Sequence, residues 1–103
     1  MAPHPRRKRC PDFAEILRAT SPDEQIRQQV ARCFHEEILR LAKRRCGDDA
    51  LAEDASQDAL IAALEALGSF RSEAPLRAWL RQIVFTACSR LRRGKAKKLG
   101  ADL

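Results

Sequence analysis

Residues 48–67 read DDALAEDASQDALIAALEAL, and residues 76–93 read LRAWLRQIVFTACSRLRR. In both stretches apolar residues recur every three to four positions, which places them on one side of an α-helix. The first stretch carries six acids and no base, whereas residues 76–98 carry eight Lys and Arg residues and no acid. Because a merely solvated helix usually mixes both signs, this separation indicates two surfaces for two partners. The alternative explanation is that both charge runs are simply solvated surface and bind no partner.

The rest of the composition narrows the fold class. The chain has 103 residues, which is enough for one hydrophobic core and too few for two. Apolar residues make up 45% of the chain and are mostly Ala, Leu and Ile, which favour helix over sheet. No alternating strand pattern, hairpin turn or internal repeat is present. We therefore predict an all-α fold, a compact bundle of three main helices plus a short N-terminal helix.

Start and stop signals set the boundaries of these helices. Asp12 is a predicted cap, and in Ser21-Pro22-Asp23-Glu24 the Ser caps, the Pro fits the first turn and the Glu closes a capping box. The predicted helices span about 12–19, from Ser21 to Gly47, from Asp48 or Asp49 to Gly68, and about 76–93. The predicted organisation is a disordered basic arm (residues 1–11), a helical domain (12–95) and a frayed C-terminal tail (96–103).

Each main helix has a predicted core stripe with helical spacing. On the second helix it consists of Ile26, Val30, Cys33, Phe34, Ile38, Leu41 and Ala42. On the third helix it consists of Leu51, Ala55, Leu60, Ala63, Leu64 and Leu67. On the last helix it consists of Leu76, Leu80, Ile83, Val84, Ala87 and Leu91.

The four cysteines do not form a recognisable metal or disulfide pattern. Cys10, Cys33, Cys46 and Cys88 are widely spaced, with no CxxC pair and no nearby His that completes a zinc site. No secretory signal and no apolar run of membrane-spanning length is found. We therefore predict a cytoplasmic protein with reduced cysteines, no disulfide, no metal, no cofactor and no membrane span.

The acidic helix carries a polar stripe opposite its leucines. Residues at i, i+3, i+4, i+7 and i+11 share this stripe, and they are Asp54, Gln57, Asp58, Ile61 and Glu65. An apolar Ile amid acids is more useful at an interface than in water. The stripe therefore suits a basic or donor-rich protein surface, with simple solvation as the alternative.

The basic helix is suited to nucleic acid, and the net charge of +6 adds a general attraction to phosphate. Opposite or flanking its core stripe lie Arg77, Arg81, Gln82, Phe85 and Arg92. Phe85 could stack on an unpaired base with Arg support, or pack against another helix. Trp79 lies at the edge of the stripe, as a core anchor or partly presented to DNA. Gln82 and Thr86 could read base edges or lie in water.

No catalytic set is present. His4 lies in the predicted arm and His35 on a charged helix surface, and no nucleophile–base pair or phosphate loop has a plausible setting. We predict that the protein is not an enzyme.

Several segments together resemble region 2 of bacterial extracytoplasmic-function (ECF) sigma factors. They are LRLAKRRCGD (39–48), AEDASQD (52–58), FRS (70–72), LRAWL (76–80) and RLRR (90–93), in matching order over roughly residues 12–95. The segment AWLRQI (78–83) is also similar to the promoter-reading helix of primary sigma factors.

This resemblance implies two binding roles. The acidic stripe, with Asp54, Gln57, Asp58 and Ile61, docks on the clamp helices of the largest subunit of core RNA polymerase. The loop from Gly68 to Ala74 and the last helix bind the non-template single strand of the promoter's minus-ten element, with one base flipped into the loop. The implied DNA-binding residues are Arg71, Ser72, Arg77, Trp79, Arg81, Gln82, Phe85, Thr86, Arg90, Arg92 and Arg93. An anti-sigma factor is a further implied partner, and the protein would join the nucleoid when bound to polymerase.

The chain departs from the family pattern in three places. Thr86 stands where the family usually has Asn, an Asp that usually follows is absent, and the closing RLRR arrives one residue early. Base preference is therefore not transferred. The family's second domain, a helix-turn-helix, is missing, so the chain is either a fragment or a stand-alone domain.

Three functions follow as alternatives. The first is a promoter-recognition domain of an alternative sigma factor in transcription initiation. The second is a stand-alone sigma-like module that binds polymerase or an anti-sigma factor without initiating transcription. The third is a general basic DNA-coating protein, which would leave the acidic stripe unexplained.

Overall fold

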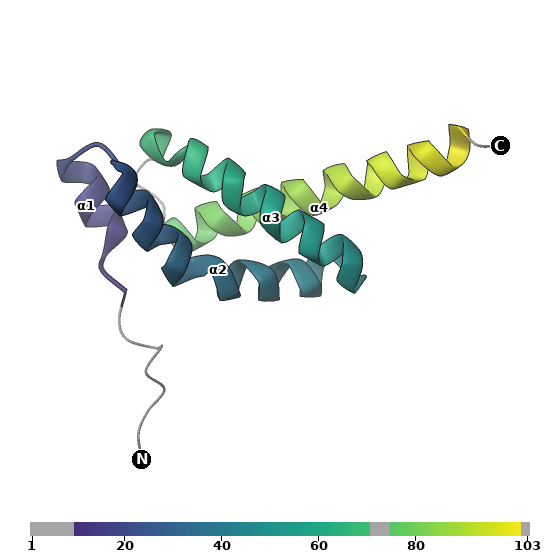
Figure 1. Cartoon of the computed structure of the whole chain (residues 1–103), viewed down its shortest axis with the longest axis horizontal. Coiled ribbons are helices and arrows are strands. Elements are labelled where there is room, and N and C mark those ends of the chain that lie inside the picture. Colours follow the sequence, from purple (N-terminus) through teal and green to yellow (C-terminus); the bar gives the residue numbers. More distant parts are fainter. Residues whose placement is uncertain (1–9, 71–74, 102–103) are drawn as a thin grey trace, which may run out of the picture.

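The computed structural model describes residues 10–70 and 75–101, with side chains up to Gly94. It contains α1 (Phe13–Ala19), α2 (Glu24–Cys46), α3 (Asp49–Glu65), the 3₁₀ turn η2 (Leu67–Ser69) and α4 (Leu76–Ala101). In Figure 1, α2, α3 and α4 pack side by side, and α1 lies against the beginning of α2. The predicted all-α fold of three main helices and a short N-terminal one is confirmed.

Local capping chemistry explains where the helices begin and end. The carboxylates of Asp12, Asp23 and Asp48 accept hydrogen bonds from backbone N–H groups in the first turns of α1, α2 and α3. The cap of α2 is therefore Asp23, and the predicted cap Ser21 is wrong. Helix α2 ends as predicted at Gly47, whose φ of 77° is in the left-handed region that favours glycine.

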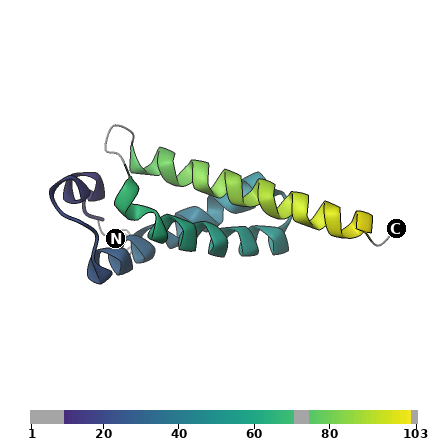
Figure 2. The ribbon, with the colours of Figure 1, turned by 90° about the horizontal axis from the view of Figure 1, so that it is seen from above.

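The C-terminal ends of α3 and α4 differ from the predicted ones. α3 ends at Glu65 and continues as the 3₁₀ turn η2 instead of running to Gly68. α4 continues to Ala101 instead of ending at Arg93, and Figure 2 shows this end projecting beyond α2 and α3. A single Gly inside a helix costs only about 1 kcal/mol relative to Ala, and the Ala and Lys residues that follow Gly94 favour helix.

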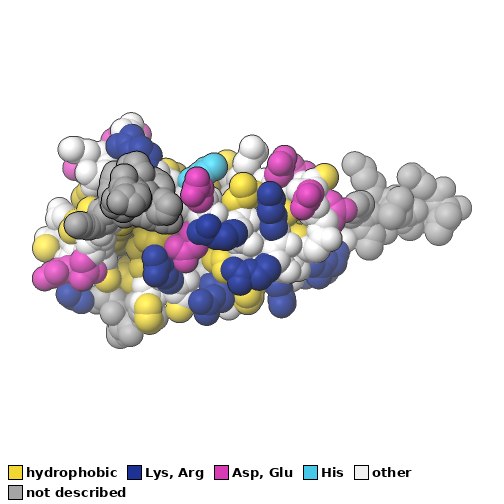
Figure 3. Space-filling view, turned by 90° about the horizontal axis from the view of Figure 1, so that it is seen from below, with side chains coloured by type: hydrophobic (Ala, Val, Ile, Leu, Met, Phe, Trp, Pro, Cys, Tyr) yellow, Lys and Arg dark blue, Asp and Glu magenta, His cyan; other side chains and the backbone are white. Residues whose placement is uncertain are grey.

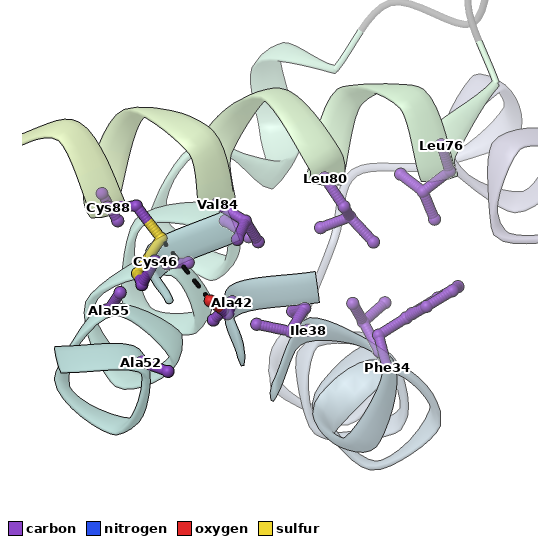
Figure 4. Close-up of a cluster of buried hydrophobic side chains, with 14 of the residues drawn as sticks. Phe34, Ile38, Ala42, Cys46, Ala52, Ala55, Leu76, Leu80, Val84 and Cys88 are labelled. Carbon is purple, nitrogen blue, oxygen red and sulfur yellow. Dashed lines mark hydrogen bonds between the residues drawn. A yellow bond between two sulfur atoms is a disulfide. The ribbon is translucent and has the colours of Figure 1, made fainter. Parts of the chain in front are cut away.

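The core is built around small side chains of α3. Ala52, Ala55, Ala59 and Ala63 are fully buried, whereas Leu51, Leu60 and Leu64 are only partly buried at the edge of the core. Of the predicted stripe, Ala55, Ala63 and Leu67 are buried, whereas the buried Ala52 and Ala59 were not predicted. Because alanines allow a close approach, α2 and α4 supply the larger core residues, among them Phe34, Ile38, Leu80 and Val84 (Figure 4). Phe13 of α1 contacts Phe34, with ring centroids 6.0 Å apart.

Two disulfides overturn the prediction of reduced cysteines. Cys10 bonds to Cys33, and Cys46 at the end of α2 bonds to Cys88 of α4, with Cα–Cα distances of 6.0 and 5.4 Å that suit a disulfide. Figure 4 shows the buried Cys46–Cys88 bond, with a dashed line from Cys88 to the carbonyl oxygen of Ala42. That 3.9 Å contact is packing, because a disulfide sulfur has no proton to donate.

Within the described parts of the chain, no helix is long and apolar enough to cross a membrane. The same residues contain no group of three or more His, Cys, Asp or Glu side chains arranged to hold a metal ion.

Candidate functional site

The acidic stripe of α3 lies on the outside of the bundle. Its alanine side faces α2 and α4, so the opposite side of the helix is left to solvent. The predicted residues Asp54, Gln57, Asp58, Ile61 and Glu65 are all exposed there. Among the described residues, Ile61 is the exposed large hydrophobic side chain, with 55% of its surface accessible. The structure thus gives α3 an acidic face with one apolar side chain in its middle.

The predicted DNA-binding residues of α4 lie on two separate flanks of the helix. Arg77, Arg81 and Phe85 are spaced four residues apart on the flank that faces α2. Trp79 marks the other flank, because its ring makes an edge-on contact with Phe70 just after η2, with centroids 5.3 Å apart. The sequence pattern had placed these residues opposite or flanking the core stripe, without assigning them to a particular flank.

The flank of Trp79 also carries exposed polar side chains. Gln82, Thr86, Arg90 and Arg93 follow Trp79 at helical spacing and are exposed. Trp79 and Phe70 are half-buried, so each side chain packs on the bundle and stays partly accessible. This flank adjoins the segment after Phe70, where the predicted DNA-binding residues Arg71 and Ser72 lie outside the described residues.

The flank that faces α2 is the wall of a basic groove. Arg40, Arg44 and Arg45 of α2 form the other wall, and Leu41 and Phe85 are the apolar side chains between them. We call this the arginine groove: Arg40, Arg44, Arg45, Arg77 and Arg81 with Glu37, Leu41 and Phe85. Figure 3 shows Lys and Arg side chains gathered over the middle of the face seen from below.

Two contacts cross the arginine groove and fix its geometry. Arg77 Nε lies 3.3 Å from Glu37 Oε1, and the guanidinium carbon of Arg45 lies 4.4 Å from the centre of the Phe85 ring. The second contact is a cation–π interaction, so one face of the Phe85 ring is covered by Arg45. The three α2 arginines were not predicted from the sequence as site residues, although their spacing with Leu41 places them on one helix face.

Arg92 has a structural contact that the sequence pattern did not predict. Its Nη2 donates to the carbonyl oxygens of Arg45 and Cys46, at 3.0 and 3.2 Å. These carbonyls belong to the last turn of α2, where no intrahelical partner is available. Arg92 therefore ties α4 to the C-terminal end of α2, next to the Cys46–Cys88 disulfide.

Comparison with known proteins places these surfaces in a family. The profile of the sigma-70 region 2 family matches residues 30–98, a range that includes most of α2, all of α3 and most of α4. The chain belongs to this family. The sigma-70 region 2 match contains both the acidic face of α3 and the arginine groove.

Two curated relatives agree with this assignment. The ECF RNA polymerase sigma factor SigM of Mycobacterium tuberculosis strain Erdman is 41% identical over 85 residues, covering 81% of this chain and 43% of the relative. The protein of the same name from strain H37Rv gives the same values. The predicted resemblance to region 2 of an ECF sigma factor is confirmed. This sigma-70 region 2 chain spans less than half the length of these relatives, and no solved structure gives a significant match.

Proposed function

We propose that this chain is the promoter-recognition domain of an ECF-type sigma factor, a non-enzymatic transcription initiation factor that acts in the bacterial cytoplasm. It docks on core RNA polymerase and binds the melted minus-ten element of promoter DNA. The observation that carries the proposal is the family match over residues 30–98 together with separate acidic and basic faces on the matched helices.

The acidic face of α3 is the proposed polymerase-docking surface. Asp54, Gln57 and Asp58 offer exposed acceptors in two successive turns, and Ile61 offers an apolar contact in the next. Charged acceptors around one apolar side chain that a partner would bury suit an interface with a basic helix pair, because charge complementarity fixes its orientation. The proposed partner is the pair of clamp helices on the largest polymerase subunit.

The Trp79 flank of α4 is the proposed base-reading surface. Gln82 and Thr86 carry hydrogen-bonding groups that can reach base edges, and the accessible parts of Trp79 and Phe70 can contact unstacked bases. Arg90 and Arg93 lie on the same flank and suit phosphate contacts, which position a strand without reading its sequence. Arg71 and Ser72 remain proposed DNA contacts. An anti-sigma factor is a further proposed partner.

The docking surface can be tested with a triple variant. In Asp54→Ala/Gln57→Ala/Asp58→Ala the fold should persist, because exposed substitutions usually change stability by less than about 0.5 kcal/mol each. Affinity for a purified clamp-helix fragment, measured by calorimetry, should fall at least about tenfold, since several charged acceptors are lost.

A matched control for this experiment is Glu15→Ala/Gln25→Ala/Glu36→Ala. It removes two carboxylates and one amide, as the α3 variant does, from exposed positions of α1 and α2 and should bind the fragment like the unmodified chain. If the α3 triple variant also keeps full affinity, the polymerase assignment of this face is wrong.

A further inference from the structure

We infer that the Cys10–Cys33 disulfide is a thiol-exchange site, which a dithiol reductant opens while the Cys46–Cys88 bond stays closed. Opening of this bond releases α1 from the bundle. The inference rests on the proposed function in one respect, because it takes the cytoplasm as the place where the protein acts. Disulfides of cytosolic proteins are usually transient and either catalytic or redox-sensing, since the cytosol keeps thiols reduced. The inference goes beyond the proposed function by giving this domain a redox-controlled segment.

The Cys10–Cys33 bond is accessible from solvent. Cys10 is exposed and Cys33 is half-buried, and both line an open cleft of about 1300 Å³ between the chain before α1, the first half of α2 and the start of α4. We call it the α1 cleft, and the apolar residues that line it include Phe13, Phe34 and Leu76. Thiol–disulfide exchange needs direct access of a thiolate to one of the two sulfurs. A reductant can therefore reach this bond while the domain stays folded.

The Cys46–Cys88 bond, by contrast, is protected by the core. Cys46 is 7% exposed and Cys88 is 0% exposed. Figure 4 shows their bond between α2 and α4, beside Ala42 and Val84. A charged thiolate reaches such a bond only when the two helices separate, which is an opening of the core itself. Exchange at Cys46–Cys88 is therefore limited by unfolding, whereas exchange at the α1 cleft is limited by encounter with the reductant.

The exchange consists of two displacement steps at sulfur. In the first, a thiolate of the reductant attacks the sulfur of Cys10, the more exposed partner, and forms a new S–S bond there. The Cys10–Cys33 bond breaks, and Cys33 leaves as a thiolate with its electron pair. In the second, the other thiolate of the reductant attacks its own sulfur in the mixed disulfide, which closes a ring and releases Cys10 as a thiolate. Both cysteines take up a proton, so the protein gains two electrons and two protons and the dithiol loses them.

The geometry favours a dithiol over a monothiol as the reductant. The Cα atoms of Cys10 and Cys33 lie 6.0 Å apart, so the Cys33 thiolate stays close to the mixed disulfide after the first step. Its effective concentration exceeds that of a second monothiol molecule in solution, and the original bond forms again. A dithiol carries its second thiol in the same molecule, so its ring closure competes with this reversal.

The Cys10–Cys33 bond is a main attachment of α1. This helix has seven residues, which is too short for stability on its own in water. Among the described residues, no hydrogen bond or ion pair joins α1 to another helix. The α1 side chains that pack on the core are Phe13, Ile16 and Leu17. Without the cross-link, these apolar contacts alone hold α1, so it should open more often and uncover Phe34 at the α1 cleft.

Selective reduction of the whole chain tests the exchange site. The oxidised chain is treated with dithiothreitol under native conditions, free thiols are blocked with N-ethylmaleimide at successive times, and peptide masses locate the blocked cysteines. Cys10 and Cys33 should be blocked at least about a hundredfold faster than Cys46 and Cys88, because exchange at a buried bond must wait for unfolding. Glutathione, a monothiol, at the same thiol concentration should open Cys10–Cys33 at least about tenfold less.

Hydrogen exchange followed by mass spectrometry measures the release of α1. In the selectively reduced chain, the α1 amides should exchange at least about tenfold faster than in the oxidised chain, whereas the α3 amides should exchange as before. The variant Cys10→Ser/Cys33→Ser should show the same fast exchange in α1 without any reductant. The matched control Cys46→Ala/Cys88→Ala keeps the Cys10–Cys33 bond, so its α1 amides should still respond to dithiothreitol.

Each outcome supports or overturns a stated part of the inference. Equal blocking rates at the two bonds would overturn the exchange site, and unchanged exchange of the α1 amides after selective reduction would overturn the release of α1. Equal opening by glutathione would overturn the dithiol as the reductant. Binding of the oxidised chain to the clamp-helix fragment is measured separately. If the fragment binds and reduction is not selective, the inference fails and the proposed function stands. If reduction is selective and no fragment binds, the polymerase assignment fails and the exchange site stands.

Discussion

The Cys46–Cys88 disulfide should contribute a large share of the stability of this domain. The bond joins residues 42 positions apart, and the loop-closure entropy of a loop of that length corresponds to about 4 kcal/mol. Domains of this size are stable by about 5–15 kcal/mol. Both sulfurs are buried, and reduced thiols would remain there as small apolar groups, so reduction should leave no large cavity to add to the loss.

The effect can be measured on Cys10→Ala/Cys33→Ala, which keeps only the Cys46–Cys88 bond. Urea unfolding is followed by far-UV circular dichroism, with and without a phosphine reductant, after unfolding and refolding so that the buried bond is reduced. With a urea dependence of about 2 kcal/mol per molar, the loss of about 4 kcal/mol should lower the midpoint by roughly 2 M. Thiol titration establishes that the bond is absent.

The reciprocal variant Cys46→Ala/Cys88→Ala serves as the matched comparison. It keeps Cys10–Cys33, which closes a shorter loop of 23 positions, so the same loop-closure entropy gives a smaller contribution of about 3.4 kcal/mol and a smaller midpoint shift of roughly 1.7 M. A midpoint shift below about 0.5 M for the Cys46–Cys88 bond would refute its role in holding α2 to α4.

Two further predictions concern packing and backbone conformation, each measured as a change in the free energy of unfolding in urea. Ala59→Leu should destabilise the fold by about 1–3 kcal/mol or more, because Ala59 is fully buried. Ala62→Leu, on the exposed side of α3, should have little effect on stability. Equal effects of the two substitutions would contradict the alanine core. Gly47→Ala should destabilise the fold by about 1–2 kcal/mol, because residue 47 has a positive φ. Gly94→Ala, inside α4 where an added Cβ meets open space, should stabilise the fold by about 0.5–1 kcal/mol. A stabilising effect of Gly47→Ala would contradict the αL cap.

The sequence predicted the features that depend on local interactions. Helix starts at Asp12 and Leu76 and the αL end at Gly47 follow from capping chemistry within a few residues. Ser21 was predicted as the N-cap of α2 in place of Asp23, because both residue types can cap a helix. Only the position of the first helical turn decides which of the two does so. The exposed acidic face of α3 followed from periodicity alone, although the buried side proved to be alanine.

The disulfides and the arginine groove could not be predicted in this way. Both depend on how α2 lies against α4, and helical periodicity gives the buried side of each helix without the register between helices. In the sequence, Arg44 and Arg45 only complement the negative C-terminal end of the α2 dipole. Without the partner helix, nothing distinguishes that role from one wall of a binding groove.

One register of α2 against α4 accounts for three side-chain contacts between the described parts of these helices. Glu37–Arg77, Arg45–Phe85 and Cys46–Cys88 advance along both helices together, so the two helices run parallel. Arg92 reinforces the far end by binding the carbonyl oxygens of Arg45 and Cys46. A disulfide at Cys46 and hydrogen bonds to the carbonyl oxygens of Arg45 and Cys46 therefore hold the backbone at and next to Arg45, the residue that covers Phe85 in the groove. Because a shift of either helix by one turn would separate Arg45 from Phe85 and Glu37 from Arg77 at once, the stability of this helix pair and the shape of the arginine groove depend on the same contacts.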